Sequence, residues 1–494
     1  MIGQKEFAGL RAMGYTRAAV YEECLADLET PLSIYLKTAN EKGTFLLESV
    51  DGSGRFSRYS FIGLRAAAEI RVRIVPEGAM VRIDGENAEP ERLCADPFAF
   101  IQDFLDAYRV YQPPELPRFT GGLCGFFGYD CAFLLEPGKL GGLKKDMIGM
   151  DDIRLMLCEE MLVVDNLKDR LYIVVHADTG SPGSLGKASR KISEVRRLLM
   201  APLSPRPILG GQKHEARRTF PKEAFIRAVR EAREHILAGD LMQVQIGQRI
   251  EKAFTEDPVS LYRVLRSLNP APYMFFFHFG DYFVIGSSPE ILVRTEQKDG
   301  AATACIRPLA GTRARGKDAL EDRVLEEELL ADPKERAEHL MLIDLARNDI
   351  GRIARPGTVK LLESYSVEKY SHVQHIVSHV EGELREGIRN MDVFKAAFPA
   401  GTLSGAPKIK AMEILNSLEP VRRGLYGGAV GYLSFSGDMD LAIAIRTGVV
   451  KDATLYVEAA AGIVADSVPE REHHETEIKA MALLRAAEIV EEGL

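Results

Sequence analysis

The sequence contains no tryptophan and only six cysteines among its 494 residues. The cysteines are scattered without the paired spacing of a metal or redox motif, so we expect reduced thiols rather than a disulfide framework. An excess of positive charge is also missing. The net charge of −9 argues against nucleic acid or an anionic membrane as the main partner.

Long apolar runs are absent as well. The stretch "YMFFFHFG" is far too short to cross a bilayer. The first residues, "MIGQKEFAGL", contain no basic region followed by an apolar run, so we expect no signal peptide and a cytoplasmic location. What is present is an ordinary globular composition, 46% hydrophobic and 27% charged, in a chain long enough for one to three domains.

The chain alternates strand-like and helix-like segments around one Pro- and Gly-rich stretch, "MAPLSPRPILGGQ" (200–212). That stretch predicts a linker between a region of residues 1–205 and a region of residues 213–494. Strands are expected at, for example, "RLYIVVHAD" and "ATLYVEAAAGIV", and a helix at "PKEAFIRAVREAREHILAGD". Many strands with Gly-rich turns and long helices predict an α+β fold with large sheets and helices outside.

Two predicted helix starts carry paired acids. Glu335 and Glu338 follow the capping residue Asp332, and Glu472 and Glu475 repeat the spacing near the end of the chain. Residues three apart share a helix face, so two such helices could form an oxygen-rich site of the kind Mg²⁺ prefers. The Glu-x-x-His and His-Glu-x-x-His spacings of di-iron and zinc sites are absent from both. Alternatively, the helix dipole alone favours all four acids.

Four further side chains are candidate functional groups on chemical grounds. Arg446 lies within the apolar stretch "LAIAIRTGVV", which predicts a strand, and a buried guanidinium there needs an internal acid or a ligand carboxylate. His375 and His379 share one face of the predicted strand "QHIVSHV", where core histidines are also common. Glu290 follows a Gly-Ser-Ser-Pro turn, where a surface acid is ordinary.

Nine sequence words, in order along nearly the whole chain, resemble the large (synthase) subunit of anthranilate synthase, in the chorismate-utilising enzyme family. The words are "LLESVDGSGRFSRYSFIG" (46–63), "GDLMQVQIGQR" (239–249), "NPAPYMFFF" (269–277), "GSSPEILVR" (286–294), "RPLAGTRARG" (307–316), "AEHLMLIDLARNDIGR" (337–352), "GTLSGAPKIKAME" (401–413), "YGGAVGYLSF" (426–435) and "DSVPEREHHETEIKA" (466–480). The resemblance implies two large antiparallel sheets packed as a sandwich, to which the N-terminal part contributes strands.

The resemblance also implies a site for chorismate and Mg²⁺. Glu338 and Glu475 would be the direct ligands, with Glu335 and Glu472 behind them. The implied substrate-binding residues are Gln243, Ala310, Gly311, Thr402, Tyr426, Arg446, Ala461, Gly462 and Lys479.

The implied reaction has two steps. Ammonia adds at ring C2 while the C4 hydroxyl leaves, with Glu290 as general acid and Thr312 facing the departing hydroxyl. The aminodeoxyisochorismate then loses pyruvate as His375 removes the C2 proton, and aromatisation of the ring drives this step.

Two positions separate the related activities. Isochorismate and salicylate synthases carry a lysine, which activates water, where this chain has Gln243. Aminodeoxychorismate synthases of folate synthesis typically carry a lysine where this chain has Ala310. Both residues favour anthranilate formation, the first step of tryptophan biosynthesis. The word "GDLMQVQIGQR" resembles the folate enzymes, so aminodeoxychorismate synthase component I is the alternative.

The ammonia source is expected to be a partner. Cys124 lies in "GGLCGFFG", but Phe126 stands where the nucleophile turn of a glutaminase needs its second glycine. A small apolar strand residue is the simpler interpretation of Cys124. The resemblance implies a separate glutamine amidotransferase subunit, anthranilate synthase component II.

Inhibition by L-tryptophan is a further implied property. The implied binding residues are Leu47, Glu48, Ser49, Pro270, Tyr273 and Met274. Ala271 replaces a serine common in this region, and Ala460 replaces a glycine common near the substrate. A non-enzyme alternative, an inactive amino-acid-binding relative, would be expected to lack a metal glutamate or His375, and all of these are present.

Overall fold

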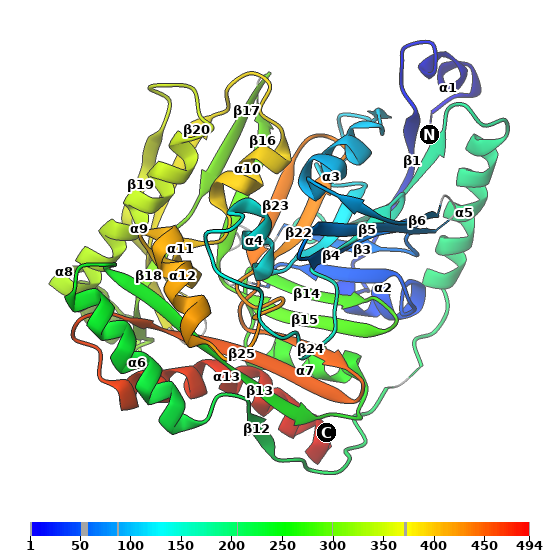
Figure 1. Ribbon diagram of the computed structural model, residues 1–494. Helices are drawn as coiled ribbons and strands as arrows, with labels where there is room; N and C mark the ends of the chain where they lie inside the picture. Colours follow the sequence, from blue (N-terminus) through cyan, green and yellow to red (C-terminus); the bar gives the residue numbers. More distant parts are fainter. Residues whose placement is uncertain are drawn as a thin grey trace.

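Two large β-sheets face each other in the computed structural model, which describes residues 2–50, 58–85, 88–204, 206–298, 300–369 and 373–493 (Figure 1). The space between them is filled mainly by apolar and aromatic side chains, such as Phe45 and Phe277 from one sheet and Phe126 and Met156 from the other. Helices pack against the outer faces. The α+β sandwich expected from the sequence is therefore confirmed.

The first sheet, sheet A, has 13 strands within the described residues, and its printed pairs are antiparallel except β1 with β7. In spatial order the strands are β12 (Ala216–Arg218), β13 (Gln243–Ala253), β25 (Thr454–Ile463), β24 (Thr447–Lys451), β15 (Tyr282–Ser288), β14 (Tyr273–His278), β2 (Thr44–Glu48), β3 (Tyr59–Gly63), β10 (Glu160–Asp165), β11 (Arg170–Asp178), β1 (Arg17–Leu25) and β7 (Val110–Tyr111), with β21 (Gly405–Ala406) paired to β13.

The second sheet, sheet B, has 12 strands in the part of the chain that the structure describes. In spatial order they are β18 (Leu309–Ala314), β20 (Val373–Glu383), β17 (Ala301–Ile306), β16 (Ile291–Lys298), β23 (Met439–Ile443), β22 (Ala429–Ser434), β8 (Gly122–Phe127), β9 (Ile153–Cys158), β4 (Ala68–Val75), β5 (Gly78–Gly85) and β6 (Glu89–Cys94), with β19 (Lys360–Lys369) paired to β20.

Both sheets take strands from both sides of the predicted linker. In sheet A, β2 pairs with β14, and in sheet B, β8 pairs with β22. The linker itself runs over the surface, where Leu203 and Leu209 are exposed, and its end is fixed to the C-terminal helix because the Gly211 N–H donates to the Glu491 carbonyl (2.8 Å). The N-terminal region thus adds strands to a shared core, as expected.

Helices α1, α2, α5, α7 and α13 pack on sheet A, and α3, α4, α6, α9, α10 and α12 pack in the cluster that covers sheet B and the ends of β13 and β25. Figure 1 shows α6 and α13 running together beside β13 and β25. The helices are α1 (Gln4–Leu10), α2 (Pro31–Thr38), α3 (Pro97–Asp106), α4 (Ala132–Leu135), α5 (Ser184–Leu199), α6 (Lys222–Leu237), α7 (Pro258–Leu268), α8 (Ala319–Ala331), α9 (Pro333–Gly351), α10 (Asn390–Ala397), α11 (Gly401–Ser404), α12 (Lys408–Leu418) and α13 (Pro469–Glu492).

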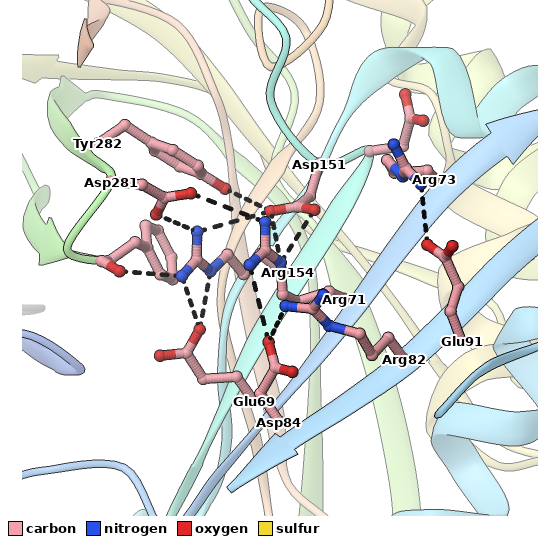
Figure 2. A network of polar contacts seen from close by, with 12 residues as sticks. Glu69, Arg71, Arg73, Arg82, Asp84, Glu91, Asp151, Arg154, Asp281 and Tyr282 are labelled. Carbon is pink, nitrogen blue, oxygen red and sulfur yellow. Dashed lines mark hydrogen bonds and ion pairs between the residues drawn. The ribbon is translucent and has the colours of Figure 1, made fainter. Parts of the chain in front are cut away.

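A buried arginine fastens the two sheets together at one edge. Arg154 of β9 donates to Glu69 of β4 (2.9 Å), to Asp281 (2.6 Å) and to the carbonyl of Phe279 in the turn between β14 and β15. Figure 2 shows Asp281 and Tyr282 of sheet A gathered around Arg154 of sheet B. Arg154 is 1% exposed and its charge is fully paired. This network therefore fixes the position of sheet B relative to the β14–β15 turn of sheet A.

The expectation of one strand through Arg446 is wrong. Strand β23 ends at Ile443 in sheet B, and β24 begins at Thr447 in sheet A. Between them Arg446 adopts a left-handed conformation with φ of 49°. The apolar run is continuous because both strands are buried, and it conceals the point at which the chain passes from one sheet to the other.

No helix among the described residues is both long enough and apolar enough to cross a membrane.

Candidate active site

Two chain crossings between the sheets place Glu290 and Arg446 side by side. Glu290 links β15 of sheet A to β16 of sheet B, and Arg446 links β23 back to β24. The crossings are joined by backbone hydrogen bonds, from Ile443 N–H to the Glu290 carbonyl (2.9 Å) and from Ser287 N–H to the Arg446 carbonyl (3.1 Å). Arg446 has the left-handed backbone that side chains rarely adopt, a strain typical of functional positions.

The Glu290 carboxyl group is suited to hold a proton near neutral pH. It is 8% exposed, and burial raises its pKa to about 7, although the Thr402 hydroxyl and the charges of Lys479 and Arg446 act in the opposite direction. The Thr402 hydroxyl donates to Glu290 Oε1 at 3.0 Å. A small cavity beside the pair is lined mainly by apolar side chains, such as Leu342 of α9. This carboxyl group is therefore a candidate general acid.

A β-bulge in sheet B positions the candidate base. Ala310 pairs with Ile376 and Thr312 with His375, so Gly311 is an extra residue in β18, and its φ of 68° is the left-handed conformation that glycine permits. The bulge brings the Thr312 hydroxyl within 3.0 Å of His375 Nδ1 and the Gly311 carbonyl within 3.0 Å of the same nitrogen.

His375 is neutral at physiological pH. Burial lowers its pKa to about 4, helped by the nearby Arg446 charge, against the hydrogen bond to Gly311. Because a carbonyl can only accept, Nδ1 carries the proton and Nε2 carries the lone pair. The structure thus supplies a histidine held in one tautomer that can take a proton at Nε2.

Strands β13 and β25 form another wall of the candidate active site. Gln243 and Gln245 point to the same face of β13, opposite Gly462 of β25, and this face continues the interior face of sheet A. A Cβ on Gly462 would lie 2.7 Å from Gln243 Nε2, so a larger residue there would displace the end of the Gln243 side chain. Ala461 points to the other face, opposite Ile246, and can offer only its backbone to a ligand.

The position of Ala460 explains how its extra methyl group is accommodated. Its register partner on β13 is Gly247, which has no side chain to compete for the space. Its carbonyl accepts a hydrogen bond from Lys479 Nζ (2.9 Å), which holds the lysine of α13 against β25.

A buried network that the sequence analysis missed supports this wall. Arg423 forms an ion pair with Glu419 (2.7 Å) and donates to the carbonyls of Gln245 (2.8 Å) and Leu403 (2.6 Å). Its guanidinium also lies 5.7 Å from the centre of the Tyr426 ring. Arg423 therefore connects β13, the short helix α11 that carries Thr402, and Tyr426. The available signal was an acid and a base four residues apart, Glu419 and Arg423, in the short stretch "LEPVRRGLYGG".

The four predicted metal ligands lie at the N-terminal ends of α9 and α13. Burial raises the pKa of Glu338, and the charges of Glu335 and Glu475 raise it further. Burial and the charge of Glu475 likewise raise the pKa of Glu472. The two helices therefore bring their carboxylates within electrostatic range of each other.

Two of these carboxylates form ion pairs with basic groups. Glu335 pairs with Arg313 (3.2 Å) and Glu475 with Lys479 (2.7 Å). Within the described residues, no group of three or more acidic, histidine or cysteine side chains is close enough to hold a metal ion. The oxygen-only donor set and the mutual repulsion of the acids still fit a hard divalent cation, which would relieve that repulsion.

A separate cavity lies between the sheets where tryptophan binding was expected. Five of the six predicted residues line it, together with Arg294, Asp440, Tyr59 and Tyr432; the five are Leu47, Glu48, Ser49, Tyr273 and Met274. Pro270 is not among the lining residues. Among the described residues, the buried Ser49 hydroxyl has no hydrogen-bond partner, whereas the Glu48 carboxylate accepts from Tyr262 (2.6 Å) and Arg266 (3.0 Å).

Residues 51–57, in the middle of the first word that carries the resemblance, lie outside the described residues. Cys124 is fully buried in the apolar layer between the sheets, and burial raises the pKa of its thiol well above the ordinary value. It therefore has the environment of a core residue rather than of a nucleophile.

Comparison with known proteins identifies the class. The family model of chorismate binding enzymes matches residues 59–485, and the chain belongs to this family. The more particular similarity is to anthranilate synthase component 1. The chain is 48% identical to the proteins of that name from Neisseria meningitidis serogroup A (497 residues) and Pseudomonas aeruginosa (499 residues), with 100% of both chains covered in each case.

A solved structure agrees with this placement. The anthranilate synthase component I of Streptococcus pneumoniae superposes with a TM-score of 0.76 at 35% identity, covering 94% of this chain and 99% of that one.

Proposed function

We propose that this chain converts chorismate and ammonia into anthranilate and pyruvate. The observation that carries the proposal is a pair of groups whose pKa values are shifted in opposite directions: up to about 7 for Glu290 and down to about 4 for His375. Near neutral pH one is available as an acid and the other as a base, which is the arrangement a two-step amination and elimination needs.

In the first step, ammonia forms a bond to ring C2, the ring double bonds shift, and the C4–O bond breaks. Glu290 gives its proton to the departing hydroxyl, which leaves as water, and Thr402 holds the carboxyl group in position. The ammonium formed at C2 then releases one proton, which balances the proton that Glu290 gave.

In the second step, His375 Nε2 takes the C2 proton, the bond from C3 to the enolpyruvyl oxygen breaks, and the ring becomes aromatic. The released enolpyruvate takes up one proton, which balances the proton that His375 removed, and becomes pyruvate. The Gly311 carbonyl fixes the Nδ1–H tautomer that this step requires. Arg446 and Tyr426 are proposed to bind the enolpyruvyl carboxylate.

Mg²⁺ is the proposed cofactor. Glu338 and Glu475 would bind it directly, and Glu335 and Glu472 would support them. Glu335 and Glu475 would exchange their ion pairs with Arg313 and Lys479 for the metal. When bound, the ion would neutralise the ring carboxylate of chorismate and draw electrons toward it.

A partner subunit is the proposed ammonia source. The relatives are named component 1, which implies a second component, and Cys124 is buried as a core residue. A glutamine amidotransferase is the partner that fits, because it would supply ammonia from glutamine.

L-tryptophan is the proposed feedback ligand of the cavity between the sheets. The unpartnered Ser49 hydroxyl and the apolar Leu47 and Met274 suit an amino acid with a large side chain. The nearby Arg294 and Asp440 pair (2.8 Å) lies in the same lining and offers both charges.

One fluorescence assay tests the reaction, the metal and the partner. The purified chain is mixed with chorismate and Mg²⁺, and ammonium, glutamine or ammonium with EDTA is added. We expect anthranilate fluorescence with ammonium alone, none with glutamine, and none with EDTA. A 4-amino product would assign the chain to aminodeoxychorismate synthesis instead. Unchanged chorismate in all samples would contradict the proposal.

A further inference from the structure

The small cavity beside Glu290 has a second carboxyl group in its wall. Asp349, near the C-terminal end of α9, lines this cavity together with Glu290. Among the described residues that line it, these two alone have ionisable side chains. Leu342, Leu345 and Ala346 lie on the same face of α9 as Asp349 and form one apolar wall. The cavity therefore joins two acids through a lining that offers no other ionisable group.

The side chain of Asp349 is only half satisfied by the protein. Asp349 is 5% exposed, and its Oδ2 accepts a hydrogen bond from Lys408 Nζ of α12 (3.0 Å). Its Oδ1 is buried and has no hydrogen-bond partner among the described residues. Because a buried carboxylate oxygen without a partner is costly, an oxygen in the wall of a cavity indicates a polar occupant of that cavity.

The cavity is large enough for water. About 40 Å³ of it is open to the centres of water-sized spheres, and one water molecule needs about 10–15 Å³ by that measure. The carboxyl groups of Glu290 and Asp349 and the Thr402 hydroxyl supply polar partners for a short chain of water molecules. Of the proposed substrate-binding residues, only Thr402 lines the cavity, so this space is separate from most of the substrate site.

Asp349 can exchange protons with solvent. Its side chain is 7% exposed and that of its partner Lys408 is 15% exposed, so the pair lies just beneath the surface. Burial raises the pKa of Asp349, although the charges of Lys408 and Arg352 act in the opposite direction. Burial also raises the pKa of Glu290, against the charges of Lys479 and Arg446. The shared direction brings the proton affinities of the two acids into a range that permits exchange between them.

We propose that water in this cavity connects Asp349 to Glu290 and returns to Glu290 the proton that it gives to the departing hydroxyl. This inference rests on the proposed function and deepens it by assigning a proton-relay residue that acts through Glu290 and does not touch the substrate.

The protons balance along this route. After the first step, Glu290 is a carboxylate, and it takes a proton from the neighbouring water. That water takes a proton from Asp349, and Asp349 takes one from solvent. The ammonium formed at ring C2 releases one proton, so the uptake and the release cancel. Glu290 can therefore recover its proton while the ring is still bound.

Asp349→Asn tests the relay, because asparagine keeps the shape of the side chain and an acceptor for Lys408 but cannot carry the proton. We expect kcat with ammonium to fall by at least about tenfold, and both KM values to change by less than about twofold. Rapid mixing at pH 6, below the pKa of about 7 of Glu290, should give one anthranilate per chain at the wild-type rate and slow turnovers afterwards. The first turnover uses the proton that Glu290 already holds.

Two further variants separate the relay from effects on folding. Asp344→Asn is the matched control on α9, since the Asp344 side chain is 64% exposed in a surface ion pair with Arg347, and it should keep the wild-type kcat. Ala346→Val adds two methyl groups to the wall of the cavity without changing any charge. It should also give one fast turnover followed by slow ones, because it displaces water from the route.

Several outcomes would overturn the inference. An unchanged kcat in Asp349→Asn would show that Glu290 recovers its proton by another route. A first turnover slowed as much as the later ones would show an effect on the fold or on the chemical step. A higher KM for ammonium would indicate a passage for the nucleophile instead. If Asp349→Asn does not fold, as judged by circular dichroism, Ala346→Val decides. A wild-type chain that forms no anthranilate from ammonium would refute the proposed function itself, which distinguishes the two failures.

Discussion

Single side chains in this molecule are tuned by burial. Glu290 and His375 both lie in desolvated positions, and desolvation disfavours the charged form of each, raising the pKa of the acid and lowering that of the base. Both groups are therefore neutral near pH 6, the state that a proton donor and a proton acceptor require. The same burial should carry a cost in stability.

Glu290→Gln should make the chain more stable and inactive. Burial raises the pKa of Glu290 from 4.5 to about 7 in the folded chain. Ionisation of Glu290 therefore lowers the free energy of unfolding as the pH rises from 4.5 through 7, by about 3 kcal/mol in total. Glutamine keeps the acceptor for Thr402 and has no charge to bury. Urea unfolding at pH 8 should show the variant more stable, and the difference should shrink toward pH 5. A less stable variant at pH 8 would contradict this account.

At the scale of elements, bulges and crossings set the site. The extra residue Gly311 turns Thr312 and the Gly311 carbonyl toward His375, and two strand-to-strand crossings place Glu290 beside Arg446. Neither the bulge nor the crossings depend on an unusual amino-acid composition of a helix or strand. They depend on where a regular element is interrupted.

Gly311→Ala should disturb the site more than the fold. Alanine at φ of 68° costs about 1 kcal/mol, and the added Cβ would lie 3.1 Å from Leu329 and 3.2 Å from Glu335. We expect kcat to fall by at least about tenfold because His375 loses its fixed hydrogen bond. Gly357→Ala is the control, since Gly357 has φ of 81° and open space around its Cβ position. Similar losses of kcat in both variants would show a general effect.

Arg423→Met should destabilise the chain by about 3–5 kcal/mol, because it leaves the buried Glu419 carboxylate without its partner. The double variant with Glu419→Met should recover part of that loss, since it removes the uncompensated charge. Denaturant unfolding measures both. Arg485→Met, which breaks only exposed ion pairs, should cost less than about 1 kcal/mol. Additive losses in the double variant would show that the pair is not coupled.

Helices and strands could be predicted from the sequence better than the points at which they are interrupted. The cap Asp332, the start of α9 at Pro333 and the strand of His375 follow from local rules and are confirmed. The break at Arg446 could not be predicted, because both flanking strands are buried and read as one apolar run. The partners of Arg423 and Gln245 could not be predicted either, because they arise from strand register and from packing between distant segments.

At the scale of the whole molecule, the predicted linker does not separate two independent cores. Strands from residues before 200 and after 213 are neighbours in both sheets, at the pairs of β2 with β14 and of β8 with β22. The apolar layer between the sheets also draws on both regions, with Phe45 and Phe126 packed near Phe277 and Phe279. Neither region alone retains its neighbours.

If the chain is cleaved after the exposed Leu203, the two fragments should therefore remain associated. A protease site inserted there should, after cleavage, leave a complex that elutes as one particle and unfolds in one transition, because the shared sheets hold the fragments together. The fragment 213–494 produced alone should be insoluble or unfolded. Two separate unfolding transitions after cleavage would indicate independent domains.

The tyrosines around the cavity between the sheets have an optical consequence. Tyr59, Tyr273 and Tyr432 line it, and the chain contains no indole of its own. An indole bound there would be the sole indole emitter in the complex and would receive excitation energy from the three phenol rings around it. Excitation of tyrosine should then produce indole emission only from occupied molecules, so the protein can report occupancy of this cavity without a label.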